Sequence, residues 1–434
     1  MRVPSPIGAW LDVLKMDQTC LKGLRAVVNP LARSQIDIAL LFATRIMRLF
    51  AYGFLSVVLA LYLEQVGLSE QAIGVLLTLT LVGDAGISLW ITTSADRIGR
   101  RRMLVLGAAL MILAGVVFIS TGNPLVLTIA AILGVISPSG NEIGPFLSIE
   151  QAALSQLLPH QRRTQVFAWY NLVGSFATAS GALSGGWLAH TLQGSGVSPL
   201  ESYRVVLIGY ALGGVALACS FLCLSPSVET TAHASPAHRT LGLHRSRQVV
   251  MKLSALFALD AFAGGFVVQS LLAYWFHITF GIDVGLLGSI FFGANILAGI
   301  SALLAARIAA RIGLINTMVF THIPSNVLLC LVPLMPTLPL AIGVLLLRFS
   351  ISQMDVPTRQ SYTMAVVAPD ERSAASGVTA IARSVGASLS PALSGLFLAT
   401  PSLIGAPFLV AGGLKIVYDV LLYRSFRGLK SPEE

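Results

Sequence analysis

The stretch Ile91–Leu104, ITTSADRIGRRRML, places four arginines and one aspartate in a short connector between two long apolar segments. An α-helix needs about 20 apolar residues to cross the hydrocarbon core of a bilayer, and each flanking segment has about that length. Arginines that gather between two such helices are typical of the cytoplasmic side of a membrane protein. The stretch therefore predicts two membrane-spanning helices joined by a basic cytoplasmic loop.

The composition of the whole chain points the same way. Of its 434 residues, 55% are hydrophobic and 11% are charged, whereas soluble domains carry about 25% charged residues. So few charges cannot cover a water-facing surface, and we expect lipid to surround most of the protein. About twelve apolar segments of spanning length follow one another along the sequence. We predict an all-α polytopic membrane protein, with the lipid bilayer as its first partner.

The net charge of +9 is distributed unevenly. Lysines and arginines crowd alternate connectors and both ends of the chain, and the other connectors hold almost none, Arg204 being the clear case. The positive-inside bias places both termini in the cytoplasm and accounts for the charge without a nucleic-acid partner. We expect a multi-pass protein of the bacterial inner (plasma) membrane. Residues 1–34 have no apolar signal region and are expected to form a cytosolic tail.

Three short sequences recur about half a chain later. ADRIG at 95–99 returns as AARIG at 309–313, an offset of 309 − 95 = 214. SGALSG at 180–185 returns as SPALSG, an offset of 390 − 180 = 210, and PHQR returns as PDER at the same 210. Echoes in nearly one register predict a duplicated six-helix unit. Because six is even, both copies enter the membrane from the same side.

A polar stretch separates the two copies. It runs over 225–249, and its irregularly spaced histidines are typical of a solvated linker rather than a metal site. The division of the chain then has five parts. We expect a cytosolic tail at 1–34, six-helix bundles at 35–224 and 250–424, a cytosolic linker at 225–249 and a second tail at 425–434.

The basic loop resembles a motif of the major facilitator superfamily, Gly-x-x-x-Asp-Arg-x-Gly-Arg-Arg. This chain departs from the motif at its first position, where Thr92 replaces glycine, and in the second copy Ala310 replaces the acid. The matching residues are Asp96, Arg97, Gly99, Arg100 and Arg101. With two six-helix halves over roughly residues 35–424, the resemblance implies a transporter whose loop gates the cytoplasmic side. The alternative is that these arginines only set the orientation.

A second motif of the family is partly present. Drug-exporting members carry Gly-Pro-x-x-Gly-Gly in the fifth helix, and this chain has GALSGG, with Ala182 in the place of proline. The matching residues are Gly181, Gly185 and Gly186. The resemblance implies efflux, although glycines at this density are also consistent with close helix packing alone.

Ionisable residues inside apolar spans are costly and tend to face water or protein. Those of the first and tenth spans follow helical steps of three and four along one face. In the superfamily the first, fourth, seventh and tenth spans line a central cavity. The predicted substrate-binding residues are Arg45, Arg48, Tyr52, Glu142, Arg348, Asp355 and Arg359.

Pairing inside the protein is the alternative for several of these ions. Asp355 and Arg359 lie four residues apart and can pair with each other. For Arg45 and Arg48 no acid lies within one turn, so their partner comes from another helix or from the substrate. In the last span, Lys415 and Asp419 (not counted as site residues) are expected to neutralise each other locally.

Prolines predict interruptions in the fourth and tenth spans. Pro145 and Pro357 are 357 − 145 = 212 residues apart, close to the repeat offset. Interrupted spans at matching places in two halves point to the binding site of a transporter. We therefore expect the substrate between these breaks and the arginines of the first span.

Arginines at mid-membrane favour a small anionic or zwitterionic substrate. Proton coupling requires a carboxylate whose affinity for protons changes as its surroundings change between wet and dry. Asp84, Glu142 and Asp260 are the candidates, with Glu142 first. Each is equally consistent with one half of a fixed salt bridge.

The expected function is secondary transport by alternating access, as proton-coupled efflux through a monomer. Proton-coupled import of a small metabolite is the alternative. No catalytic residue, metal site or cofactor is predicted, because the sequence contains no Gly-Lys dipeptide for a Walker A loop and neither HExxH nor GxSxG. A transporter-like membrane sensor and an intramembrane enzyme are more distant alternatives.

Overall fold

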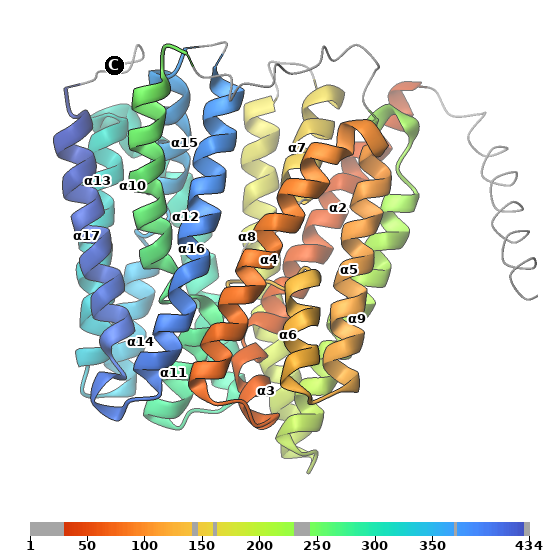
Figure 1. Cartoon of the computed structure of the whole chain (residues 1–434), viewed down its shortest axis with the longest axis vertical. Coiled ribbons are helices and arrows are strands. Elements are labelled where there is room, and N and C mark those ends of the chain that lie inside the picture. Colours follow the sequence, from red (N-terminus) through yellow and green to blue (C-terminus); the bar gives the residue numbers. More distant parts are fainter. Residues whose placement is uncertain (1–29, 141–145, 159–162, 230–243, 369–370, 429–434) are drawn as a thin grey trace, which may run out of the picture.

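The computed structural model describes residues 30–140, 146–158, 163–229, 244–368 and 371–428. All regular secondary structure in these ranges is helical. The helices form two side-by-side bundles, the first from α2 to α9 and the second from α10 to α17 (Figure 1). Helix α2 begins and α17 ends at the upper end of Figure 1, which we call the terminal end. The opposite end is called the far end.

Each bundle is continuous in sequence. The first contains α2 (Pro30–Ser56), α3 (Leu59–Gln65), α4 (Glu70–Ile98), α5 (Arg100–Ser120), α6 (Pro124–Leu133), α7 (Phe146–Leu157), α8 (Arg163–Gly194) and α9 (Pro199–Leu222). The second contains α10 (Arg247–Gly265), α11 (Gln269–Phe280), α12 (Val284–Ile312), α13 (Leu314–Leu331), α14 (Leu338–Phe349), α15 (Asp355–Val366), α16 (Arg372–Leu398) and α17 (Ala406–Phe426). In each bundle two pairs of consecutive helices make up one span each, so the eight helices form six spans. The two six-helix bundles predicted from the repeat are confirmed.

Several far-end turns carry the capping residues that start a helix. The side chain of Asn123 accepts hydrogen bonds from two N–H groups of α6, with Pro124 in the first turn. Asp283 does the same for α12, and Ser69 and Ser198 cap α4 and α9. Such caps satisfy N–H groups that the helix leaves without an internal partner. They explain why short turns suffice between long apolar helices.

Four spans are broken, and the breaks lie at similar depths in the bundles. The first, fourth, seventh and tenth spans each consist of two helices: α2 and α3, α6 and α7, α10 and α11, and α14 and α15. The far-end pieces α3, α6, α11 and α14 contain 7, 10, 12 and 12 residues. At 1.5 Å per residue the breaks therefore lie about 10–18 Å from the far end.

The proline prediction is partly confirmed. The tenth span breaks at 350–354, and α15 begins at Asp355, so Pro357 lies in the first turn, where a missing N–H is tolerated. Pro145 lies outside the described residues, but α7 begins directly after it. The sequence analysis missed the breaks at 57–58 and 266–268, which contain no proline.

Two glycine pairs bring the bundles together toward the far end. A Cβ atom on Gly186 of α8 would lie 2.8 Å from Gly288 Cα of α12, and one on Gly74 of α4 would lie 2.9 Å from Gly395 Cα of α16. The pairs are repeat-related, because 288 − 74 = 214 and 395 − 186 = 209. Within the first bundle, Gly181 and Gly185 allow α8 to pack on α2. The predicted glycine motif therefore lies in close helix contacts.

We expect Gly186→Leu to separate the bundles at the far end, because a side chain there would meet the backbone of α12. Spin labels at the far ends of α8 and α12 should report a longer distance in the variant. Gly343→Leu is the matched control, since a Cβ at Gly343 meets nothing within 4 Å. An unchanged distance in Gly186→Leu would contradict the assigned contact.

Candidate functional site

Hydrogen bonds join the two bundles where the first, fourth and seventh spans are broken. The Oγ of Ser270, at the start of α11, donates to the backbone oxygens of Ser56 (2.8 Å) and Pro138 (2.7 Å). Gln269 donates to Ser56 Oγ at 2.7 Å and accepts from Asn295 at 3.1 Å. Broken helices expose backbone acceptors, and polar side chains from both bundles satisfy them at this depth.

Arg48 on α2 is fully buried and forms a two-pronged ion pair with Glu150 on α7. Its two terminal nitrogens each lie 2.7 Å from a carboxylate oxygen. Glu150, which is also 0% exposed, accepts further hydrogen bonds from Thr44 at 3.0 Å and from the hydroxyl of Tyr170. Bidentate geometry and extra donors are what a buried pair needs to offset its desolvation. The pair ties the first span to the fourth and fifth.

Arg45 also has its partners on another helix. Its Nε donates to the backbone oxygen of Tyr170 at 2.7 Å, and Nη2 donates to Asn171 Oδ1 at 3.1 Å. Its guanidinium lies 4.3 Å from the centre of the Tyr170 ring. Tyr52, one step further along α2, is 0% exposed. Substrate binding by Arg45, Arg48 and Tyr52 stays a prediction, and the structure gives both arginines protein partners.

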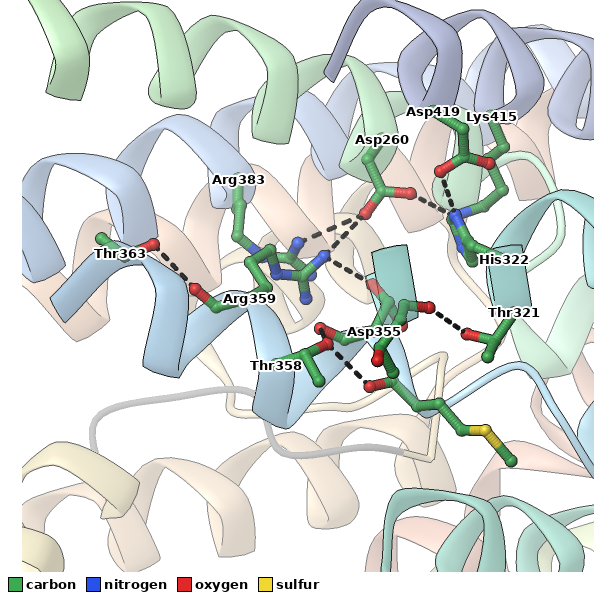
Figure 2. Close-up of polar contacts among 12 residues, drawn as sticks. Asp260, Thr321, His322, Asp355, Thr358, Arg359, Thr363, Arg383, Lys415 and Asp419 are labelled. Carbon is green, nitrogen blue, oxygen red and sulfur yellow. Dashed lines mark hydrogen bonds and ion pairs between the residues drawn. The ribbon is translucent and has the colours of Figure 1, made fainter. Parts of the chain in front are cut away.

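The second bundle contains a larger ionic network, centred on Asp260 of α10 (Figure 2). Asp260 Oδ1 lies 2.5 Å from Lys415 Nζ of α17. Its Oδ2 lies 3.1 Å from Arg359 Nη1 of α15 and 3.3 Å from Arg383 Nη1 of α16. One carboxylate therefore connects four helices. This arrangement is that of a fixed ionic contact, which the sequence analysis gave as the alternative to proton coupling at Asp260.

Two further carboxylates complete the network. Asp355 pairs with Arg359 at 2.9 Å, as their spacing predicted. Asp419 accepts from Asn326 at 3.0 Å and lies 2.8 Å from Nδ1 of His322 on α13. The expectation that Lys415 and Asp419 neutralise each other was wrong. Lys415 contacts Asp260 of α10 instead, and Asp419 contacts His322 of α13.

Arg348 differs from the other arginines inside the spans. It lies at the end of α14, just before the break, and is 9% exposed. Its guanidinium lies 4.8 Å from the centre of the Phe349 ring and interacts electrostatically with Asp355, and its Nε has no hydrogen-bond partner among the described residues. A buried guanidinium whose donors lack protein acceptors is costly, and such a group is a candidate ligand for a bound solute.

The three proton-coupling candidates have different outcomes. Asp84 is buried on α4, at 4% exposure. Asp260 is the centre of the ionic network. Glu142, the first choice from the sequence, lies outside the described residues. Titration at any of these positions stays a prediction.

The sequence matches the Major Facilitator Superfamily over residues 41–391. The chain belongs to the major facilitator superfamily. It is also 31% identical over 424 residues to an uncharacterized membrane protein of Saccharomyces cerevisiae, covering 91% of this chain and 94% of the yeast protein. The resemblance inferred from the basic loop is therefore confirmed, and the protein is a transporter-family member embedded in the membrane.

Solved structures of superfamily transporters share the fold at low sequence identity. A bacterial homolog of the human lysosomal transporter Spinster, in an inward-facing and unoccupied conformation, has a TM-score of 0.68 at 16% identity and covers 92% of this chain and 96% of its own. The nucleoside transporter NupG gives 0.68 at 14%, with 90% and 99% covered. The human organic anion transporter MFSD10 gives 0.61 at 15%, with 91% and 100% covered.

The superfamily loop forms the tight turn between α4 and α5. Gly99 adopts φ +114°, which L side chains rarely adopt. The N–H groups of Arg100 and Arg101 donate to the carboxylate of Glu229 at 2.7 and 3.2 Å. Arg97 is exposed, and the Asp96 side chain lies outside the described parts. The carboxylate thus caps the positive end of α5, and gating by the loop stays a prediction.

Glu229 lies at the start of the linker, and a second carboxylate, Glu371, binds the backbone at the end of the linker. Glu371 precedes α16 and is 1% exposed, and its oxygens accept from the N–H groups of Arg245 at 2.7 Å and Ser246 at 2.8 Å. It also accepts from the N–H of His244. Burial acts to raise the pKa of Glu371, but these backbone hydrogen bonds outweigh it and lower the pKa to about 2.

The sequence identified most of the charged residues inside the spans but few of the residues with which they pair. It did not pair Arg48 with Glu150 of the fourth span, because the two lie 102 residues apart. It gave no role to His322, although a histidine inside the apolar run TMVFTHIPSN is a visible signal. Glu229 and Glu371 sit in polar connectors, where an acid carries no special signal.

Glu150→Gln is expected to lower the free energy of unfolding by about 3–5 kcal/mol, because it leaves Arg48 buried without an anion. Denaturant unfolding in detergent micelles measures this change. The control is Glu201→Gln, whose partner Arg204 lies 2.5 Å away at the surface. An exposed pair contributes about 0–1 kcal/mol. Equal stability of the two variants would contradict the assigned role.

The linker contact of Glu371 should depend on pH. A carboxylate with a lowered pKa stabilises the fold fully above its ordinary pKa of about 4.5, and this contribution is lost as the pH falls toward about 2. We expect the stability difference between the wild type and Glu371→Gln to narrow between pH 6 and pH 3. Thermal unfolding across that range measures it, and a constant difference would count against the hydrogen bonds to the linker.

Proposed function

We propose that the protein transports a small anionic or zwitterionic solute and that Arg348 contributes to its binding site. The observation that carries this proposal is the contrast between Arg348 and three other arginines inside the spans. Arg45, Arg48 and Arg359 each hydrogen-bond to protein groups, whereas no hydrogen bond of Arg348 is recorded among the described residues. An anion at the break of the tenth span would supply the hydrogen-bond acceptors that Arg348 lacks.

The proposed mechanism is alternating access by a monomer, whose two bundles come from one chain. Support comes from where the bundles meet. Their recorded contacts extend from the far end, at Gly186–Gly288 and Gly74–Gly395, to about the middle of α8 and α12, where Ser175 meets Gly299. The basic loops lie at the terminal end, which we propose is cytoplasmic. In that orientation the contacts close the outer side.

Proton-coupled efflux is the proposed mode, with proton-coupled import as the alternative. The partial GALSGG motif supports efflux, and the buried carboxylates support coupling to protons. The test is transport by the purified protein in proteoliposomes. A panel of labelled carboxylates, organic phosphates, organic anions, zwitterionic amino acids and neutral nucleosides is assayed for uptake and counterflow, with and without a pH gradient.

The pH gradient separates the two modes. Faster export when the opposite side is acid would support proton antiport, and accumulation toward the alkaline side would support import with protons. Transport of the neutral solutes alone would contradict the anionic or zwitterionic substrate. No transport of any panel member would contradict the proposal as a whole.

Arg348→Ala is expected to reduce transport of the best anionic substrate on the order of tenfold or more, because a charge-assisted contact contributes about 1.5–3 kcal/mol. It should not lower the thermal stability, since the guanidinium has no recorded protein acceptor to lose. Arg204→Ala, at an exposed ion pair, is the matched control. Normal transport by Arg348→Ala, or a loss of stability without a loss of affinity, would remove Arg348 from the site.

A further inference from the structure

We infer that His322 and Asp419 form a proton-binding site between α13 and α17, inside the second bundle. This inference rests on the proposed function, because it names the group that takes the coupling proton. The ninth and twelfth spans lie outside the set that was expected to line the cavity. The site was therefore not among the sequence candidates.

The geometry is that of a buried acid–base pair. His322 Nδ1 lies 2.8 Å from Asp419 Oδ1, and the other carboxylate oxygen accepts from Asn326 Nδ2 at 3.0 Å. The Asp419 side chain is 1% exposed and that of His322 is 6% exposed. Asn326 Oδ1, beside the pair, and Ser325 Oγ of the preceding residue are buried with no hydrogen-bond partner among the described residues. They leave acceptors and donors through which a proton or a water could be exchanged.

Asp260 is a weaker proton acceptor than this pair. A proton on Asp260 would leave Arg359, Arg383 and Lys415 gathered around a neutral group, and like charges in a low dielectric repel strongly. Asp419 faces a histidine and a neutral amide instead. Histidine is the side chain that most readily exchanges a proton between pH 5 and 8.

One added proton changes the net charge of the ionic network. The carboxylates of Asp260, Asp355 and Asp419 equal in number the permanent cations Arg359, Arg383 and Lys415. With His322 neutral, the network is therefore balanced, and one added proton leaves it with a net positive charge. The groups that face the pair are Asp260 on α10 and Lys415 and Tyr418 on α17. Arg359 on α15 and Arg383 on α16 lie on the other side of Asp260, and Asp355 pairs with Arg359 (Figure 2).

A route from the pair to the lining helices is present. Lys415 lies one helical turn before Asp419 on α17 and contacts Asp260, which contacts Arg359 of α15. A change of charge at His322 and Asp419 would alter the electrostatic force on Lys415 and with it the contact between Lys415 and Asp260. Helix α15 begins at the break that follows Arg348, so the network ends beside the proposed solute ligand.

Proton binding is first measured without any substrate. The purified full-length protein in detergent is titrated from pH 8 to pH 5, and the protons taken up are counted. We expect His322→Gln and Asp419→Asn each to take up about one proton fewer than the wild type, because each half of the pair is needed to hold the charge. Asn326→Leu should still bind the proton, with its midpoint at a higher pH, since ionised Asp419 loses a donor.

Transport separates a coupling role from a structural one. With the panel solute that the wild type moves fastest, His322→Gln and Asp419→Asn should lose pH-gradient-driven transport by about tenfold or more, within the range of coupling between two sites. Counterflow at equal pH should persist, and Asp419→Glu should restore the driven rate. The control is His190→Gln, which breaks an exposed histidine–aspartate pair, with Asp283 at 3.1 Å, and should keep the gradient-driven rate.

Two outcomes would overturn the inference. In one, His322→Gln, Asp419→Asn and Asn326→Leu all titrate like the wild type, which makes the pair a fixed structural contact. In the other, His322→Gln and Asp419→Asn both transport the solute at the wild-type rate under a pH gradient, which would mean that the coupling proton binds at another site. Absence of any wild-type transport would instead contradict the proposed function, while the titration still decides whether the pair binds a proton.

Discussion

A charged side chain inside a bilayer must have a partner, and this requirement determines how each bundle is held together. In the first bundle one bidentate pair, Arg48 with Glu150, connects the first and fourth spans. In the second bundle, Asp260 connects helices α10, α15, α16 and α17. Lipid tails do not drive apolar helices together as water does, so such pairs and close glycine contacts supply much of the specificity of packing.

The two bundles repeat one architecture but use it differently. The breaks and the glycine contacts occur in both copies at nearly the same offset. The ions repeat only in part. The pair of Arg48 and Glu150 returns with its charges exchanged as Asp260 and Arg359, whereas His322 and Asp419 extend the polar interior of the second bundle to the ninth and twelfth spans. A symmetric scaffold with an asymmetric polar interior suits a carrier in which one half moves a proton and both halves enclose a solute. That assignment rests on the proposed function.

Much of the fold was predictable, because it depends on properties that repeat along the sequence. Span length, the basic connectors and the offsets near 210 identified two bundles and the family. The breaks at 57–58 and 266–268 carried a weaker signal. Val57 and Val58 return as Val267 and Val268, and 267 − 57 = 210, so a β-branched pair marks both sites. The ion partners were not predictable, because which helix faces a charge depends on packing between distant segments.

The linker ends have a consequence for how the chain is built. Glu229 binds the start of α5 in its own bundle, and Glu371 binds residues 244–246 next to its own bundle. Between Glu229 and His244 lie 244 − 229 = 15 peptide units, which could reach roughly 50 Å when fully stretched. Each of these two anchors is therefore local to one half, and the chain between them is long enough to span a wide gap between the halves. Two separately synthesised halves would retain both of these anchoring contacts.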